Sequence, residues 1–389
     1  FGGSGTSNGG AVGGNVNLAA DGGTVRSLTS LVLNANAVSG ESTGPTASGA
    51  AIGGTVEILV GSDSRSFLDF ERLEAHGDAG SATSLGLGGV NVGGFASFRA
   101  DGGQYDGLAL ILSADADGQF NQSASAGDVS FIMTGGEGAI NFIQAAANAT
   151  GGDMAAGAAS PISYGGSVEF RLIGGTLSAQ SLVAAADGRG GDGVDGLSSA
   201  NGVITAGNGS GGQGGSLLYS LNGTAEVAIR NNSLSASGYG GQGGFVDSQG
   251  GPVVLPGGGG DAIGGQVNVS LLSGTFGPGN FFVQALGRSG NAGRVFGSGS
   301  FQNLTVPGNS PRPSGGIAFG GEAVVRLGVG TAGSSYFVDS TASAGEGGQG
   351  FAGGAGGDAF GGLSHFIVDN FDAGDIFVDL RSEGYGGQG

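Results

Sequence analysis

Few residues in this chain could do acid–base or nucleophilic chemistry. It has no cysteine and two histidines, His76 and His365, which lie far apart in the sequence. A Ser-His-Asp arrangement needs a histidine beside an activated serine, and no pattern in the sequence indicates one. The paired carboxylates of "DFERLE" (69–74) are explained by a solvated strand face. We therefore expect no catalytic residue and no enzyme activity.

Glycine-rich phosphate loops give no usable signal. Gly207, Gly209 and Gly212 match G-x-G-x-x-G, but with 94 glycines in 389 residues such matches arise by chance. The dinucleotide fingerprint also needs a strand before the motif and a helix after it. All twelve basic residues are arginine, so a Walker-type lysine is absent. We expect no nucleotide cofactor.

Calcium is the one metal for which a motif is present. The segments "GGDGVDGLS" (190–198) and "GGAGGDAFG" (353–361) match the calcium-binding nonapeptide G-G-x-G-x-D-x-U-x. Calcium-binding rolls use tandem copies of this motif, whereas these two copies are isolated. Asp192, Asp195 and Asp358 are therefore candidate calcium ligands, and loop aspartates without metal are the alternative.

The composition limits the classes of partner. With 31 acidic against 12 basic residues the net charge is −19, which repels nucleic acid and anionic membranes. No run of 18 apolar residues occurs that could span a membrane as a helix. Because 38% of residues are hydrophobic and only 11% are charged, the chain is expected to be ordered despite its glycine content.

An internal repeat organises the whole chain. A doublet of small residues, usually Gly-Gly, precedes a six-residue segment such as "NVNLAA" or "TVEILV", and nine copies start near residues 13, 53, 93, 126, 165, 214, 264, 320 and 361. The second, fourth and sixth positions of the segment are apolar in every copy except for Ser364, and the third is mostly polar. This alternation predicts a β-strand with one buried face. Nine copies of the same columns predict stacked strands.

A second strand and a variable glycine-rich excursion complete each repeat. The second strand reads "LVLNANAVSG" (31–40) or "SLVAAADG" (181–188), and the excursion reads "GYGGQGG" or "GNGSGGQGG". Repeat length varies through the excursion, so we expect it at the surface. Runs of glycine can form extended polyglycine helices similar to polyproline II. Phe245, Phe319 and Phe360 are expected to anchor such a layer, as are Phe296 and Phe351.

The predicted fold is all-β: a parallel β-solenoid of about nine repeats of ~40 residues with a glycine-rich side layer, for which a polyglycine-like (polyproline II-like) layer and loops are the two alternatives. Residues 1–389 form one repeat array in this interpretation. The sequence leaves open whether each repeat makes one coil or two.

Two alternatives to a purely structural role follow from exposed side chains. Arg99, Arg171 and Arg326 share an outward strand position, as a polysaccharide-lyase site would require, but other residue types interrupt the column. A solvated or ion-paired face explains them. Tyr239 and Tyr385, both in "GYGGQG", are candidates for a ligand-binding surface, and packing or turn tyrosines are the other interpretation.

The alternation of "GGSVEFRLIGGTLSAQSLVAAADGRGGDG" (165–193) with long glycine excursions resembles the glycine-rich β-strand repeats of large bacterial surface adhesins, of the filamentous-haemagglutinin-like and autotransporter-like kinds. The resemblance covers the whole chain as a pattern. It implies a β-solenoid filament, stalk or adhesin shaft that is extracellular or on the cell surface.

We therefore expect a structural segment of a bacterial fibre, with copies of itself or flanking repeats as end-to-end partners. A ligand- or calcium-binding adhesin module, with a host or surface ligand, is the alternative. The last residues, "GYGGQG", joined to the first, "FGGSG", continue the internal phrase "GYGGQGGF". We expect both ends to lie within repeats of a head-to-tail array.

Overall fold

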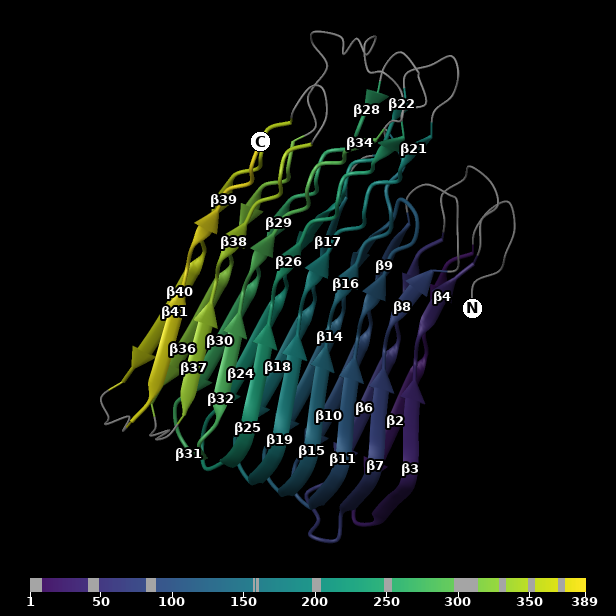
Figure 1. Ribbon diagram of the computed structural model, residues 1–389. Coiled ribbons are helices and arrows are strands. Elements are labelled where there is room, and N and C mark those ends of the chain that lie inside the picture. Colours follow the sequence, from purple (N-terminus) through teal and green to yellow (C-terminus); the bar gives the residue numbers. More distant parts are fainter. Residues whose placement is uncertain are drawn as a thin grey trace.

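The computed structural model describes residues 9–40, 49–81, 89–156, 158, 161–197, 204–247, 254–296, 314–328, 334–348, 354–369 and 375–389. These residues form a parallel β-solenoid of nine rungs, stacked from the purple N-terminal rung to the yellow C-terminal rung in Figure 1. Each repeat passes once through each of four main sheets, with the β3-sheet segment of the seventh repeat divided into two strands, so a repeat makes one coil. The described residues contain no helix.

The nine six-residue segments identified in the sequence form one sheet, here called the β2 sheet. All its pairings are parallel and in register, so that Val16 pairs with Val56 and Phe98 with Phe131. The predicted inward columns are therefore confirmed. The strands are β2 (Asn15–Ala20), β6 (Thr55–Val60), β10 (Phe95–Ala100), β14 (Asp128–Met133), β18 (Ser167–Leu172), β24 (Ser216–Leu221), β30 (Gln266–Leu271), β36 (Glu322–Leu327) and β40 (Leu363–Val368).

The second predicted strand forms the β3 sheet, which faces the β2 sheet across the core. Two consecutive residues that are not buried interrupt the alternation in the middle of its longer strands, and the β3–β7 pair shifts register there, between Ser27 and Ser30, as in a bulge. Its strands are β3 (Thr24–Asn34), β7 (Phe67–His76), β11 (Gln104–Ser113), β15 (Glu137–Ala146), β19 (Thr176–Ala185), β25 (Glu226–Ser235), β31 (Thr275–Phe276), β32 (Asn280–Gln284), β37 (Ser335–Asp339) and β41 (Phe377–Arg381).

Two narrow sheets lie between these walls and the glycine-rich part. The β1 sheet contains β1 (Ala11–Val12), β5 (Ala51–Ile52), β9 (Val90–Val92), β13 (Ser123–Ser125), β17 (Ile162–Tyr164), β23 (Gly211–Gln213), β29 (Ala262–Ile263), β35 (Ala318–Phe319) and β39 (Ala359–Phe360). The β4 sheet contains β4 (Ala37–Ser39), β8 (Ala79–Ser81), β12 (Ala116–Asp117), β16 (Ala149–Thr150), β20 (Gly188–Arg189), β26 (Gly238–Tyr239), β33 (Gly287–Arg288), β38 (Ala342–Ser343) and β42 (Gly384–Tyr385).

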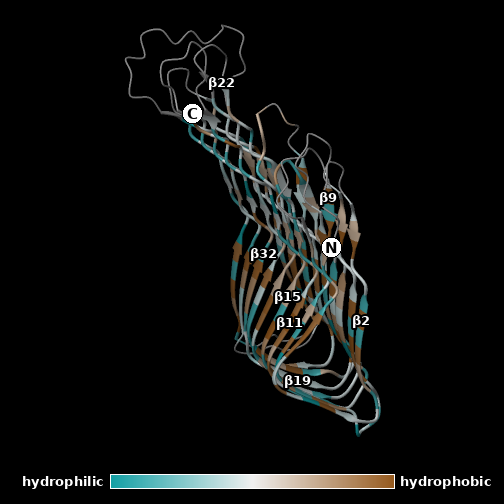
Figure 2. Ribbon diagram, turned by 90° about the vertical axis from the view of Figure 1, so that its right-hand side faces the viewer, coloured by the Kyte–Doolittle hydropathy of each residue, from teal (hydrophilic) through white to brown (hydrophobic). Residues whose placement is uncertain are grey.

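Beyond the narrow sheets the later rungs extend into a glycine layer (Figure 2). It also carries two small sheets, β21 (Gly196–Leu197), β27 (Val246–Asp247) and β34 (Val295–Phe296), and β22 (Ile204–Thr205) and β28 (Val254–Leu255). In the layer each rung runs out and returns, and backbone hydrogen bonds zigzag between the two arms. The Gly241 amide donates to the Ser210 carbonyl, the Gly260 amide to Gly241 and the Gly290 amide to Gly260, over 2.8–2.9 Å. This is the side layer that the glycine runs predict.

The core between the long walls is a stack of apolar columns. Phe98, Phe131, Phe170 and Tyr219 lie on successive rungs, with ring centroids 4.4–5.2 Å apart and rings nearly parallel. Stacked rings of this kind add to the free energy gained by burial. The columns run through successive rungs and give the solenoid its hydrophobic core, and one of them is interrupted by the buried polar residue Asn232.

A left-handed glycine makes the turn between the two long walls. In the described residues the glycines with φ between 66° and 94° all lie at this turn, and they are Gly22, Gly103, Gly136, Gly175, Gly223 and Gly274. A residue with a β-carbon is disfavoured at such φ values. The turn therefore requires glycine for its backbone conformation. The glycine layer requires glycine because a β-carbon would collide with the backbone of the neighbouring arms.

A ladder of side-chain acceptors joins the rungs at the corner between the β3 and β4 sheets. At this corner the side chain of one rung accepts a hydrogen bond from the backbone amide of the next. The ladder runs over distances of 2.6–3.2 Å through Asn36, Asp78, Asp115, Asn148, Asp187 and Ser237 to the amide of Leu286. Buried amides at the corner are thus satisfied without a regular strand.

The expectation that aromatic residues anchor the glycine layer is wrong where it can be checked. Phe319 and Phe360 lie on the outward face of the β1 sheet, are 42% and 52% exposed, and stack on each other at 5.0 Å. Phe245 is 41% exposed. The layer excludes side chains because its arms approach closely, so its aromatic residues point outward. Phe351 and the side chain of Phe296 lie outside the described residues.

Candidate functional site

Most arginines of the described chain neutralise nearby carboxylates. Eight of the eleven described arginines form ion pairs with Asp or Glu. The remaining three are Arg189, Arg230 and Arg288, for which no ion pair is found among the described residues; Arg312 lies outside them. In a chain with a net charge of −19, arginines without a carboxylate partner are candidate binding groups for an anion. These three line two surface grooves.

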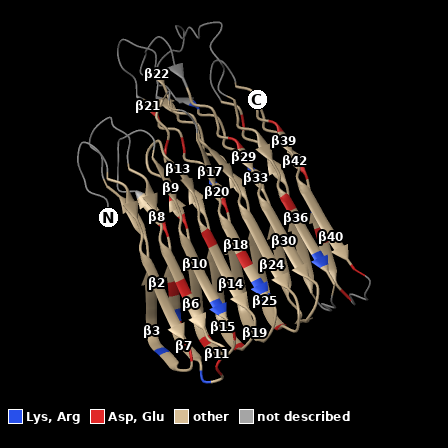
Figure 3. Ribbon diagram, turned by 180° about the vertical axis from the view of Figure 1, so that it is seen from behind, with Lys and Arg blue, Asp and Glu red and all other residues tan. Residues whose placement is uncertain are grey.

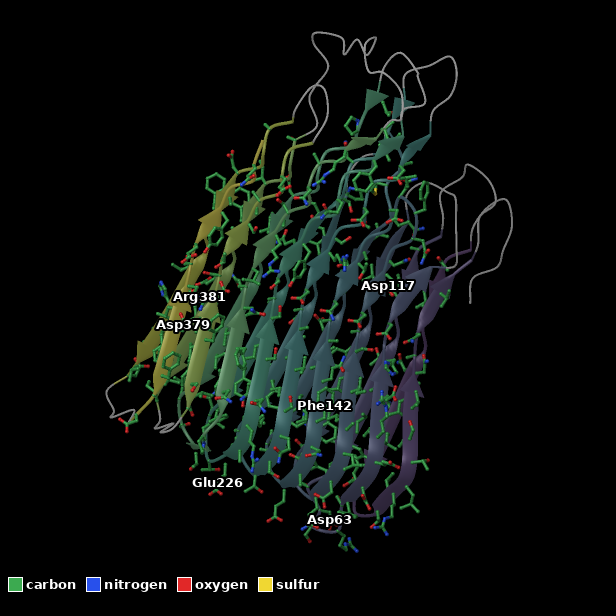
Figure 4. The ribbon with its side chains drawn as sticks, in the orientation of Figure 1. Asp63, Asp117, Phe142, Glu226, Asp379 and Arg381 are labelled. Carbon is green, nitrogen blue, oxygen red and sulfur yellow. The ribbon has the colours of Figure 1, made fainter. Side chains whose placement is uncertain are left out.

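The first groove, here called the arginine groove, lies on the outward face of the β4 sheet. Its registered column reads Asp117, Thr150, Arg189, Tyr239 and Arg288 from β12 to β33. Figure 4 labels Asp117 at the N-terminal side of this column. Since adjacent strands lie ~4.8 Å apart, the two arginines flank the tyrosine and their Cα atoms are separated by about 10 Å. The β4 sheet thereby places a cation on each side of an aromatic ring.

The arginine groove has a volume of about 470 Å³. Its lining residues come from four rungs and are mostly polar: Asn148, Ala149, Thr150, Asp187, Arg189, Asp192, Tyr239, Gly240, Gln242, Arg288 and Ser289. Both arginine side chains are exposed and Tyr239 is half-buried. The groove therefore offers cations, one ring, and amide and hydroxyl groups to a ligand.

Burial raises the pKa of the Tyr239 phenol, and the charge of Asp187 acts in the same direction. The hydrogen bond with Ser237 and the charges of Arg288 and Arg189 act against this rise in pKa. The phenol is therefore neutral at physiological pH, and both guanidinium groups lie close enough to influence it. Burial likewise raises the pKa of Asp187, although hydrogen bonds from Ser235 and Ser237 lower it in part.

The structure places two of the three candidate calcium ligands on one rung. Asp192 Oδ1 accepts a hydrogen bond from the Gln242 amide and Asp195 Oδ1 accepts one from the Phe245 amide, each over 2.8 Å. Asp358 lies three rungs away. Within the described ranges no group of three His, Asp or Glu side chains is placed to hold a metal ion. Calcium binding stays a prediction, and melting with and without EDTA tests it.

The two candidate ligand-binding tyrosines lie in one column but differ in surroundings. Tyr239 lies in the arginine groove, whereas Tyr385 is two rungs beyond Arg288, 56% exposed, and donates its hydroxyl hydrogen to Glu383. The two tyrosines occur in identical "GYGGQG" segments, so the local sequence does not distinguish them. Only the register shows that arginines flank the first.

The structure also brings a serine to His76, which the sequence did not indicate. Ser113 pairs with His76 in register, and its Oγ lies 2.7 Å from His76 Nδ1, while Glu74 lies 2.9 Å from Nε2. The Ser113 hydroxyl donates to Asp78 over 2.7 Å and the serine is only 5% exposed. A nucleophile must instead donate to the histidine and face a substrate.

The charges around His76 indicate a structural cluster. Its hydrogen bond with Asp78 raises the pKa of His76 above its usual value, against the effect of burial, and Glu74 adds to the rise. The hydrogen bonds from His76 and Arg72 lower the pKa of Glu74. The His76 ring, held between Glu74 and Asp78, joins side chains at this corner of the solenoid. His365 lies exposed on β40, on a different wall.

The other motifs of the sequence lie on solvated faces. Arg99, Arg171 and Arg326 point outward from the β2 sheet and pair with Asp101, Glu169 and Asp369. Figure 3 shows that blue and red segments both occur on the strands of that wall. In "DFERLE", Glu71 is exposed and Arg72 pairs with Glu74. Gly207, Gly209 and Gly212 lie in a returning arm of the glycine layer and in β23, with no helix after them.

The second groove, of about 490 Å³, crosses the bulge of the β3 sheet. Its floor contains small residues of successive rungs, Ala139, Ser178 and Ala228, and Leu108 and Arg230 stand at its edges. Phe142, labelled in Figure 4, lies beside it on β15. The lining is mostly apolar and contains one arginine, Arg230, without an ion pair among the described residues. It therefore indicates the chemical class of a ligand less clearly than the arginine groove does.

No protein-family model, curated protein or solved structure matches this chain. The described residues also include no helix that is long and apolar enough to cross a membrane. The fold itself is that of a parallel β-solenoid, with repeated strands in stacked sheets.

Proposed function

We propose that this chain is a non-enzymatic structural segment of an extracellular bacterial fibre or giant adhesin shaft. The observation that supports this most directly is the unbroken register of nine rungs in four sheets. At ~4.8 Å per rung, eight steps give a rod section of about 38 Å. Its inter-rung hydrogen bonds run along the rod axis, which suits a load-bearing spacer.

The outermost rungs support end-to-end assembly. Strands β2 and β3 at one end, and β40 and β41 at the other, pair on one side only. Their inward residues Val16, Leu18 and Phe366 are only partly buried, whereas the same columns are fully buried in the interior. Unpaired strand edges of this kind are templates for further strands. Rungs of the same polypeptide or of a second copy would continue both the sheets and the core.

Electron microscopy of the purified chain at increasing concentration tests the shaft. We expect rods of constant width whose length increases by end-to-end stacking. Phe366→Asp places a charge in the inward column and should stop the growth, whereas His365→Asp changes an outward residue of the same strand and should not. Monodisperse particles that stay one segment long at every concentration would contradict the assembly proposal.

A second candidate function, a ligand-binding module displayed on the solenoid, is favoured by one observation. Arg189 and Arg288 face the same groove without an ion-pair partner among the described residues, although most other arginines are paired. A shaft has no evident use for this arrangement. The two functions are compatible, because adhesin shafts can display binding sites along their length.

A further inference from the structure

We propose that the arginine groove binds a chain of acidic sugars, with carboxylates held by Arg189 and Arg288 and a sugar ring lying against Tyr239. This inference names the ligand of the second candidate function and rests on it. It is independent of the shaft proposal, because the groove lies on the side of the rod and the assembly edges lie at its ends.

The cations of the groove identify the ligand as an anion. A guanidinium presents a planar fork of donors that matches a carboxylate bidentately. Elsewhere on this chain that fork is occupied, as in Arg171 with Glu169 and Arg99 with Asp101. Arg189 and Arg288 are exposed, and their donors are available to a ligand.

The remaining lining identifies the anion as a saccharide. Tyr239 supplies a half-buried ring with a neutral phenol, a surface on which the apolar face of a sugar packs. Asn148, Thr150 and Gln242 add amide and hydroxyl groups that can exchange hydrogen bonds with sugar hydroxyls. The two arginines lie two rungs apart along the solenoid axis, so a polymer parallel to that axis would place one carboxylate on each arginine.

The acidic residues of the groove favour a polyanion of low charge density over a densely charged one. Asp192 lines the rim, is exposed, and has one carboxylate oxygen beyond the one that accepts the Gln242 amide. It can accept a sugar hydroxyl, but it repels a densely charged chain. With the net charge of −19, this disfavours nucleic acid and heavily sulfated polymers. One carboxylate per sugar fits the pair of cations.

Calorimetric titration with oligogalacturonate, and with the same oligomer as its methyl ester, tests the proposal. The ester keeps the sugar chain and removes its charge. The variants are Arg189→Gln, Arg288→Gln and Tyr239→Ala. The matched control is Arg171→Gln, which removes the same charge from an exposed site on the β2 sheet. A thermal melt of each variant confirms that it folds, and both groove arginines are exposed, so their loss should leave the fold intact.

We expect the unmodified chain to bind oligogalacturonate and to bind the methyl ester at least about tenfold more weakly. Arg189→Gln and Arg288→Gln should each weaken binding by about tenfold or more, the effect of losing a charge-assisted hydrogen bond pair. Tyr239→Ala should weaken binding by about tenfold through loss of the ring on which the sugar packs. Arg171→Gln should stay within about twofold, as expected for a change outside the site.

Three results would each overturn the proposal: no binding of oligogalacturonate, equal binding of the ester, or equal losses in Arg171→Gln and the groove variants. Failure of this experiment is distinguishable from failure of the shaft. Rod formation is read by electron microscopy on the same samples, without any saccharide.

Discussion

The two halves of each later rung, the part between the long walls and the part in the glycine layer, exclude water in opposite ways. Between the long walls, side chains fill the space, and a large ring on one rung lies over a glycine on the next, as Phe70 does over Gly107 and Tyr105 over Gly138. In the glycine layer the backbone itself fills the space. A β-carbon on Gly241 would lie 1.9 Å from the carbonyl oxygen of Gly191. Figure 2 shows the hydrophobic colouring concentrated in the walled half.

This difference explains how the two halves vary. The walls fix the length of each rung but accept Val, Leu, Ile, Phe or Tyr in a column, because packing depends on total volume. The glycine layer accepts almost no side chain, yet it absorbs nearly all the variation in repeat length, since arms of different length keep the same hydrogen bonds. The packing of the walled half therefore depends on its side chains, whereas the packing of the glycine layer depends on their absence.

The largest effect should come from a single methyl group in the glycine layer. We expect Gly241→Ala to destabilise the layer by more than about 4 kcal/mol, because its β-carbon meets backbone that cannot move aside. Thermal unfolding and amide exchange of the layer measure this. Gly80→Ala in β8 is the matched control, since nothing lies within 4 Å of its β-carbon, and it should be neutral or slightly stabilising. Equal effects of the two substitutions would refute the close packing of the layer.

In the walled half the largest loss should come from the aromatic stack. Phe131 is fully buried, with ring centroids 5.0 Å from Phe98 and 4.4 Å from Phe170. Phe131→Ala should cost about 3–4 kcal/mol in the free energy of unfolding, measured by chemical denaturation. Ile132→Ala, the outward neighbour on β14, should cost about 1 kcal/mol. A Phe131 loss as small as that of Ile132 would show that the core is loosely packed.

The walls could be predicted from the sequence because their signal is local and repeated. Nine segments alternate with period two, and all nine coincide with the strands of the β2 sheet. The glycine layer could be predicted in outline from composition. Its outward aromatic residues could not, because Phe319 and Phe360 occur in glycine-rich segments whose packing depends on neighbouring rungs.

The arginine groove could not be predicted from one repeat. Arg189 and Arg288 occur in different repeats, and nothing near them in sequence marks them as a pair. A signal was present in the alignment of repeats, because the residue after the second strand's turn reads Arg, Tyr, Arg in three successive copies. The Ser113–His76 contact could not be predicted from one repeat either, because the two residues lie on adjacent rungs. Side chains from adjacent rungs meet, and only the register shows which ones.

A buried polar residue in the walled core, Asn232, should lower the stability of the protein. In the glycine layer, by contrast, the packing is made by the backbone. Asn232 occupies an inward column between Leu182 and Phe281, and its Oδ1 is buried without a hydrogen-bond partner in the described structure. Its Nδ2 donates to the carbonyls of Ile229 and Asn280, each over 3.3 Å. Asn232→Leu should still stabilise the protein by about 2 kcal/mol, because removing the unsatisfied acceptor and filling the column outweigh the loss of these two long hydrogen bonds. Asn231→Leu on the outward face is the control, with a change within about 0.5 kcal/mol. A destabilised Asn232→Leu would mean that the amide is held by an unseen partner.

The smallest predicted effect depends on pH and concerns the ladder at the corner of the walls. Burial raises the pKa of Asp115 to about 6, and the charges of Asp78 and Asp117 add to this, while the amide of Asn148 acts against it. A carboxyl whose pKa is raised on folding stabilises the protein below its ordinary pKa of 3.8 and loses that stabilisation as the pH rises through 6. At pH 7.5 the ionised Asp115 is therefore a net cost.

Asp115→Asn should remove this cost and keep the ladder, because the next rung already uses Asn148 in the same role. We expect a gain of about 1–2 kcal/mol at pH 7.5 that disappears near pH 4, measured by chemical denaturation across that range. Slower amide exchange in the variant should be found at the corner between the β3 and β4 sheets, where Asp115 lies. The glycine layer, whose hydrogen bonds join backbone groups that do not titrate, should show no change beyond the intrinsic pH dependence of exchange. A gain that is independent of pH would exclude ionisation as its cause.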